Sequence, residues 1–186
     1  MSAFAHLHKH IVAACLAAVW ISGPASAQSA AVDDFLNQLQ DAEPAQAERI
    51  VDAILSEWSK SGSAAVDLLY RRGQDAISAR DYVLATEHLT AAIDHAPEFA
   101  EAYSARANAY YRLNMIGPAL DDLGRVLVLN PQNFIALRGF AVILEELERP
   151  EEALELYGRS LALFPGDTDA LEAQERIRQD LLGAAL

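Results

Sequence analysis

Three prolines, Pro97, Pro131 and Pro165, stand 34 residues apart in this chain. Each one ends a segment that repeats the same order of large and small apolar residues. Self-similarity at a fixed period of this length indicates a stack of like units, none of which can bury its apolar face alone. Because proline cannot continue a helix, the prolines should mark the end of each unit. The period therefore predicts one helical unit stacked several times.

Residues one period apart fall into columns of similar size. In each unit a column of large residues lies four positions before a column of small ones, so both lie on one face of a helix. A second column of small residues follows on a second helix. Small residues at the crossing let the two helices approach closely, while the bulky columns fill the space between hairpins. The columns are Leu69, Tyr103 and Leu137; Gly73, Ala107 and Ala141; and Ala85, Ala119 and Ala153.

The period, the small-residue crossing and the terminal proline together resemble the tetratricopeptide repeat (TPR) family, in an exported bacterial form. The resemblance implies an all-α fold, a right-handed superhelical stack of antiparallel helix hairpins. Arg72 and Arg106 depart from the family pattern, which usually has an aliphatic residue there. Their stems are expected to cover apolar surface while their heads stay in water. The three repeats are residues 66–99, 100–133 and 134–167.

Both ends of the stack are expected to be capped, as stacked repeats require. Residues 28–63 are interpreted as a degenerate hairpin and a hinge, the hairpin capping the stack at its N-terminal end. Its helices should be splayed, because Leu39 and Val51 replace the small residues of the crossing. Residues 168–186 are expected to form a C-terminal capping helix. Its apolar stripe is Ala170, Ala173, Ile177 and Leu181.

Residues 1–27 are typical of a cleavable signal peptide, with cleavage expected after Ala27. The apolar run from Ile11 to Ile21 is about half the length of 20 residues that a membrane span needs. We therefore expect a periplasmic or secreted protein with no stable membrane insertion after cleavage. The only cysteine, Cys15, lies inside this run, and whether it is ever lipidated stays open.

The formal net charge of −13 disfavours nucleic acid as a partner, because nucleic-acid binding needs dense positive surface. No glycine-rich phosphate loop and no zinc-binding His-Glu-x-x-His motif occurs in the sequence. His88 and His95 share a helix face, but no third metal ligand accompanies them. We therefore expect no catalytic residue, no metal site, no cofactor and no enzyme activity.

The TPR resemblance implies that function lies in a concave groove lined by the first helix of each hairpin. Unlike the core columns, the inward-facing columns do not repeat, as expected if each position contacts a different part of a partner protein or extended peptide. Variation would also be expected of positions that only face water. The candidate groove residues are Tyr70, Gln74, Ile77, Ser104, Asn108, Tyr111, Arg112, Arg138, Val142 and Glu145.

Two interpretations of the groove cations remain open. Arg112 and Arg138, with Asn108, could hold a carboxylate of a bound peptide through charge-assisted hydrogen bonds. Alternatively, both arginines pair with Glu145 or Glu146.

Some members of the family clamp the C-terminus of a partner with two basic residues and two asparagines. Only Asn108 matches that set here, since Ser104 and Gly139 stand where a lysine and the second asparagine would be expected. That clamp is therefore not expected. The alternative function is a permanent structural subunit of a cell-envelope assembly, contacting its neighbours through the convex face.

Overall fold

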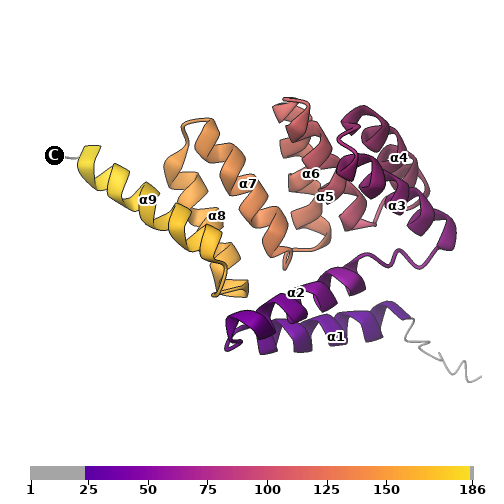
Figure 1. The fold of residues 1–186 in the computed structure, drawn as a ribbon, viewed down its shortest axis with the longest axis horizontal. Coiled ribbons are helices and arrows are strands. Elements are labelled where there is room, and N and C mark those ends of the chain that lie inside the picture. Colours follow the sequence, from indigo (N-terminus) through magenta and orange to yellow (C-terminus); the bar gives the residue numbers. More distant parts are fainter. Residues whose placement is uncertain (1–23, 185–186) are drawn as a thin grey trace, which may run out of the picture.

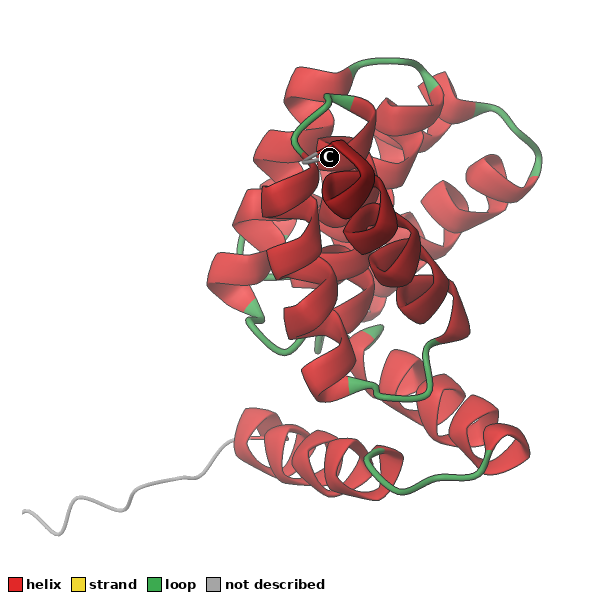
Figure 2. Cartoon of the chain, turned by 90° about the vertical axis from the view of Figure 1, so that its left-hand side faces the viewer, coloured by secondary structure: helices red, strands yellow, loops and turns green. Residues whose placement is uncertain are grey.

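The computed structural model of the protein describes residues 24–184, with side chains from residue 30 to residue 183. This range forms nine α-helices and no strand (Figure 1, Figure 2). The signal-peptide prediction, apart from its last four residues, lies outside the described residues. Within residues 24–184, no helix is long and apolar enough to cross a membrane. The helices are α1 (Pro24–Leu39), α2 (Pro44–Trp58), α3 (Ala64–Ser78), α4 (Tyr82–His95), α5 (Ala100–Arg112), α6 (Ile116–Leu129), α7 (Phe134–Glu146), α8 (Pro150–Leu163) and α9 (Thr168–Ala184).

Three helix hairpins, α3–α4, α5–α6 and α7–α8, lie side by side in Figure 1. In each hairpin the small residues of the two helices are buried at the crossing, as the periodic columns predict. Ala85, Ala119 and Ala153, on the second helices, have no exposed surface at all. A larger side chain at these positions would hold the two helices apart. The expected all-α stack of helix hairpins is confirmed.

The turn inside each hairpin adopts the same backbone conformation. Arg80, Asn114 and Glu148, one period apart, have φ angles of 61°, 59° and 58°. In the first turn, the N–H of Arg80 donates to the Ile77 carbonyl and the N–H of the following residue, Asp81, to the Ala76 carbonyl, each at 2.9 Å. This pair of bonds is the Schellman motif, which satisfies carbonyl groups at the end of a helix. The left-handed residue ends the first helix and reverses the chain.

Arg106 does not keep its head in water, contrary to the sequence-based expectation. Its Nε and Nη2 atoms donate to the two carboxylate oxygens of Asp122, both at 2.8 Å. Both side chains are largely buried, with exposed fractions of 15% and 8%. The guanidinium also lies 5.6 Å from the ring centroids of Tyr103 and Tyr110. The hydrogen bonds to the Asp122 carboxylate raise the pKa of Arg106, and the opposite charge of that carboxylate raises it further. Arg106 therefore joins α5 to α6 through a part-buried ion pair.

The α1–α2 hairpin does not lie where the sequence-based interpretation placed it. Instead of covering the first repeat as an end cap, it runs beneath the stack (Figure 1). Its core, which includes Leu39 and Ile54, packs against Phe134, Leu163 and Phe164 of the third repeat. The side-chain amide of Gln40 also donates to the Leu163 carbonyl at 2.9 Å.

Aromatic side chains explain this position. The ring centroid of Trp58, at the end of α2, lies 5.6 Å from that of Phe134. Phe134 in turn lies 5.6 Å from Phe164. At the corresponding positions the second repeat carries Ala100 and Asn130, and the first carries Val66 and Ala96. The third repeat therefore offers the hairpin a larger apolar surface than the earlier repeats do, and burial of such surface drives packing.

The linker between α2 and α3 is held by hydrogen bonds. The backbone N–H and the hydroxyl of Ser61 donate to Asp67 Oδ1 at 2.9 and 2.6 Å. Gly62 follows with a φ of 80°, a backbone conformation that residues other than glycine rarely adopt. The expected hinge at this point therefore has a defined conformation, and Asp67 anchors it.

At the other end, α9 covers the third repeat with the apolar stripe that the sequence suggests. Ala170, Ala173 and Ile177 are buried against a cluster that includes Leu144 and Tyr157. The polar side of α9 is exposed, which is what the end of a repeat stack needs for solubility.

The crossing of the first hairpin gives a test of this packing. A Cβ atom added at Gly73 would lie 2.5 Å from Cγ of Leu89, a fully buried side chain. Gly73→Ala should therefore lower the free energy of unfolding, since overpacking costs about 1–3 kcal/mol. Gly124→Ala is the matched control, because nothing lies within 4 Å of the added atom. That change should raise stability by about 0.5–1 kcal/mol through helix propensity. Urea unfolding of both variants measures the two signs, and a stabilising Gly73→Ala would contradict the close crossing.

Candidate binding groove

Two adjoining cavities open along the first helices of the repeats. The first, of about 220 Å³, lies between α5 and α7. The second, of about 450 Å³, lies between α2 and the helices α3 and α5. They share Ser104, Asn108 and Ile135, so they form one continuous depression, which we call the binding groove.

The floor and walls of the binding groove differ in character. The floor of the first cavity is apolar, formed by Leu123, Ile135 and Ile143 with Ala107 and Ala136. The second cavity is lined mainly by polar side chains. They are Asp52, Ser56, Ser59, Tyr70, Gln74, Glu101, Ser104 and Asn108.

Helix α2 forms one wall of the groove, a contribution that the sequence-based interpretation missed. Asp52, Leu55 and Ser56 of α2, with Ser59 directly after it, line the second cavity. The apolar face of α2 could be recognised in the sequence, but nothing in the sequence indicated which surface that face would cover.

Seven of the ten predicted groove residues line the two cavities. Ile77 does not, because it packs against the buried cluster of the first hairpin that contains Ala85 and Leu89. Arg138 and Glu145 are engaged elsewhere in the molecule. The seven are Tyr70, Gln74, Ser104, Asn108, Tyr111, Arg112 and Val142.

Tyr70 is part of the groove wall and is not a freely exposed anchor. Its ring packs edge-on against Phe99, with centroids 5.2 Å apart. Its hydroxyl accepts a hydrogen bond from the side-chain amide of Gln74 at 2.9 Å. Burial raises the pKa of the Tyr70 phenol, and the nearby Glu101 carboxylate raises it further, so the phenol is neutral.

Glu101 is a buried carboxyl group on the wall of the second cavity, with an exposed fraction of 8%. The side-chain amide of Asn133 donates to its Oε1 atom at 3.0 Å. Burial raises the pKa of Glu101 to about 7, and the Asn133 hydrogen bond only partly offsets this. The Oδ1 atom of Asn133 also accepts from the N–H of Ala136, capping α7. This polar link therefore joins α5 to the first turn of α7.

Tyr111 and Arg112 lie at the far end of the first cavity. The Tyr111 hydroxyl donates a hydrogen bond to the Glu146 carboxylate, which raises the pKa of the phenol. Arg112 is exposed and has no hydrogen-bond or ion-pair partner among the described residues. Neither Glu145 nor Glu146 pairs with it, contrary to one of the two sequence-based alternatives.

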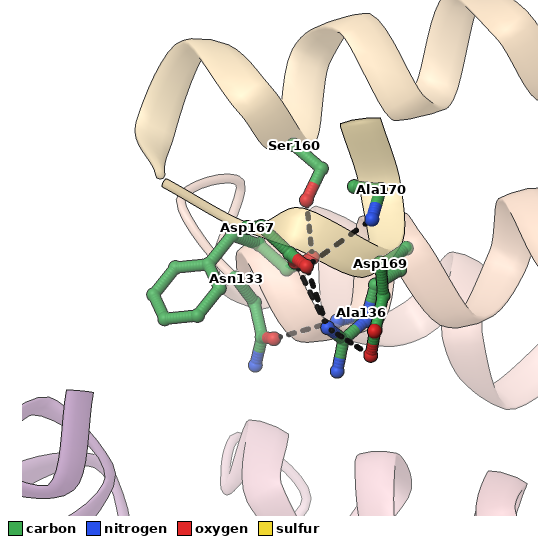
Figure 3. A network of polar contacts seen from close by, with 8 residues as sticks. Asn133, Ala136, Ser160, Asp167, Asp169 and Ala170 are labelled. Atoms are coloured by element: carbon green, nitrogen blue, oxygen red, sulfur yellow. Dashed lines mark hydrogen bonds and ion pairs between the residues drawn. The ribbon is translucent and has the colours of Figure 1, made fainter. Parts of the chain in front are cut away.

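Arg138 also has a different partner from those expected. Its Nη1 atom donates to both carboxylate oxygens of Asp167, at 3.0 and 2.9 Å, and lies 3.7 Å from Asp169. Asp167 in turn accepts from the N–H of Ala170 at 3.2 Å and so caps α9. Figure 3 shows the capping side chains Asn133 and Asp167, one period apart, beside the first turn of α7 and of α9. Arg138 therefore orients the cap of the last helix.

Glu145 is likewise held by the last helix. Its carboxylate accepts hydrogen bonds from Arg176 of α9 and from the Tyr157 hydroxyl. It therefore connects α7 with α9 and contributes nothing to the lining of the two cavities.

Comparison with known proteins identifies the fold family. A family model described as the tetratricopeptide repeat matches residues 70–115 and 118–168, which is more than half of the chain. A TPR repeat-containing protein of Rhizobium etli is 30% identical over 153 residues, covering 82% of this chain and 75% of that protein. The chain therefore belongs to the tetratricopeptide repeat family, as the periodic columns suggested.

Two further similar proteins are connected with chaperones by name. Hsp70-Hsp90 organizing protein 1 of Glycine max is 27% identical over 143 residues, covering 77% of this chain but only 24% of that protein. Among solved structures, the first TPR of Spaghetti (RPAP3) bound to the HSP90 peptide SRMEEVD is similar with a TM-score of 0.62 at 27% identity. That similarity covers 64% of this chain and 95% of the solved one.

The raised pKa of Glu101 predicts a pH dependence of stability. The folded protein keeps a proton that the unfolded chain, with its ordinary pKa of 4.5, releases between pH 4.5 and about 7. The contribution of Glu101 to stability is therefore complete below pH 4.5 and is lost as the pH rises to about 7. Glu101→Gln keeps the acceptor for Asn133 and cannot ionise. Relative to the parent, the variant should gain up to about 3 kcal/mol between pH 4.5 and 8.

Urea unfolding across this pH range measures the difference between Glu101→Gln and the parent. Glu87→Gln makes the same chemical change at an exposed carboxylate of α4 and serves as the control. Parallel stability profiles for Glu101→Gln and the parent would contradict the assigned burial of Glu101.

Proposed function

We propose that this protein is an exported, non-catalytic protein–protein interaction module that holds an extended segment of a partner protein in the binding groove. The groove itself is the observation that carries the proposal. Its apolar floor can accept side chains of the partner, while Asn108 and Gln74 present hydrogen-bonding groups along the path. Apolar pockets with a few placed polar groups are the usual form of a recognition site.

The relatives support this proposal. The RPAP3 domain is similar in fold to the greater part of this chain and holds a short peptide of HSP90. The Glycine max relative is named as an organizing protein of Hsp70 and Hsp90. We extend to this chain only the mode of action, the capture of a segment of another protein.

A second candidate function is a permanent structural subunit that contacts its neighbours through the outer helices. Exposed apolar side chains on those helices favour it. Val128 of α6 is 72% exposed and Val83 of α4 is 57% exposed. Isolated apolar residues on a surface are common, however, so this observation is weaker than a continuous groove.

Gly139 offers a direct test of the groove. It lines the first cavity, and an added Cβ atom would meet only Cδ2 of Leu123, at 3.9 Å. Gly139→Leu should therefore fill the cavity without displacing the core, and should reduce partner binding at least about tenfold. Gly124→Leu makes the same change on α6, where nothing lies within 4 Å, and should leave binding unchanged.

The measurement is quantitative capture of proteins from an envelope extract by the parent and by both variants. Circular dichroism checks that all three are folded. If Gly139→Leu captures the same partners as the parent, the groove is not the binding site and the structural-subunit function gains support.

Export is the second part of the proposal. Its support is the sequence of residues 1–27, and the expected cleavage after Ala27 falls in the first turn of α1. Expression of the full sequence in a Gram-negative host should give a periplasmic protein whose N-terminal residue is Gln28. N-terminal sequencing of fractionated cells measures this. An uncleaved chain confined to the cytoplasmic fraction would contradict export.

A further inference from the structure

We infer that the binding groove takes a segment in which a lysine or arginine stands beside apolar side chains, and that it rejects acidic segments. This inference rests on the proposed function and names the chemistry of the partner. Three features carry it: the carboxylates of the second cavity, the acidic cavity that adjoins it, and the apolar floor of the first cavity.

The second cavity has a carboxylate on each of two walls. Asp52 comes from α2 and Glu101 from α5. Among the described residues, no lysine or arginine lines this cavity. A cationic side chain entering between α2 and α5 would therefore find acceptors on two sides and no like charge among the lining residues.

The Glu101 carboxylate is positioned to accept from a ligand. Its Oε1 atom already accepts from Asn133, but Oε2 accepts no hydrogen bond within the described structure. Every fully buried side-chain oxygen and nitrogen in that part of the chain has a partner. Oε2 must therefore be accessible from one of the two cavities that Glu101 lines, the second cavity or a neighbouring one whose lining includes Trp58, Lys60 and Glu98. A charge-assisted hydrogen bond to such a partly buried oxygen is stronger than one between neutral groups.

Asp52 also lines a third cavity, of about 360 Å³, between α2 and the residues at the start of α9. Its lining includes Glu48, Asp167 and Asp169. Arg138 is its one cationic lining residue, and the Asp167 carboxylate already pairs with it. The acidic character of the second cavity therefore continues past Asp52.

The first cavity supplies the apolar part of the recognition, through Ile135 and Ile143 on its floor. Among the described residues, Arg112 is the single cation that lines the first two cavities; it lines the first cavity, whereas Asp52 lines the second. A partner with one cationic side chain between the walls and a neighbouring apolar side chain on the floor would satisfy both cavities.

The segment inferred for this groove differs in charge from the peptide that the RPAP3 domain holds. The peptide held there, SRMEEVD, carries three acidic residues near its end. This chain has Ser104 and Gly139 at the positions where a carboxylate clamp would need a lysine and an asparagine. Asp52 and Glu101 line its groove, and its net charge of −13 repels acidic segments at longer range.

The test is selection of randomised short segments displayed on phage against the purified protein, followed by affinity measurements on the selected peptide made synthetically. We expect enrichment of Lys or Arg next to Leu, Ile, Val or Phe. The double variant Asp52→Asn, Glu101→Gln should bind that peptide about tenfold more weakly than the parent and with a smaller salt dependence. Asp52→Asn alone, at an exposed residue, serves if the double variant does not fold.

The control is the double variant Glu87→Gln, Asp94→Asn, which removes two exposed carboxylates of α4 that line none of the three cavities. Its affinity should stay within about twofold of the parent, since charges beyond a Debye length are screened. Enrichment of Asp, Glu or a free C-terminal carboxylate overturns the inference and leaves the proposed function standing. Unchanged affinity of the groove variants also overturns it. If no enriched segment loses binding in Gly139→Leu, the proposed function fails as well.

Discussion

The close crossing of two helices in each hairpin is the constraint on which the rest of this structure depends. Gly73, Ala107 and Ala141 are buried at these crossings, and Gly73 lies directly against the Leu89 side chain of its partner helix. Close packing leaves the bulky residues of each unit pointing toward the next unit, so every hairpin must stack to bury them. Stacking then brings α3, α5 and α7 side by side, and the groove lies along these three helices. The site is therefore a consequence of the packing rule, and only its lining residues are free to vary.

The repeat region could be predicted closely because each unit solves the same packing problem. The columns identified the buried positions, and seven of the ten inward positions line the groove. The α1–α2 hairpin could not be placed, because its position depends on a contact between distant residues. Trp58 and Phe134 are far apart in the sequence, and neither belongs to the periodic pattern. The period of the repeats predicts contacts between neighbouring hairpins of the stack. It does not predict the position of a hairpin that lies outside the stack.

The charged residues of the site were predicted less well than the apolar ones, for a related reason. Arg138 and Glu145 satisfy the inward spacing, but each finds an opposite charge on the loop before α9 or on α9 itself. A long side chain reaches several residues, so spacing alone does not determine its partner. Glu101 differs from its sequence-based expectation in another way. An acidic residue at an inward position is expected to face water, but Glu101 is buried. Asn133, the N-cap residue of α7, donates a hydrogen bond to it.

The position of the α1–α2 hairpin affects how the molecule unfolds. In an open array, each unit touches only its neighbours, and the end units fray first. Here the Ser61–Asp67 bonds fix the hairpin to the start of the first repeat, while Trp58 and Gln40 fix it to the start and the end of the third. The hairpin thus closes the linear array into a ring of contacts. Loosening either end strains the connection to the other, so the repeats and the groove wall should be lost together in one cooperative transition.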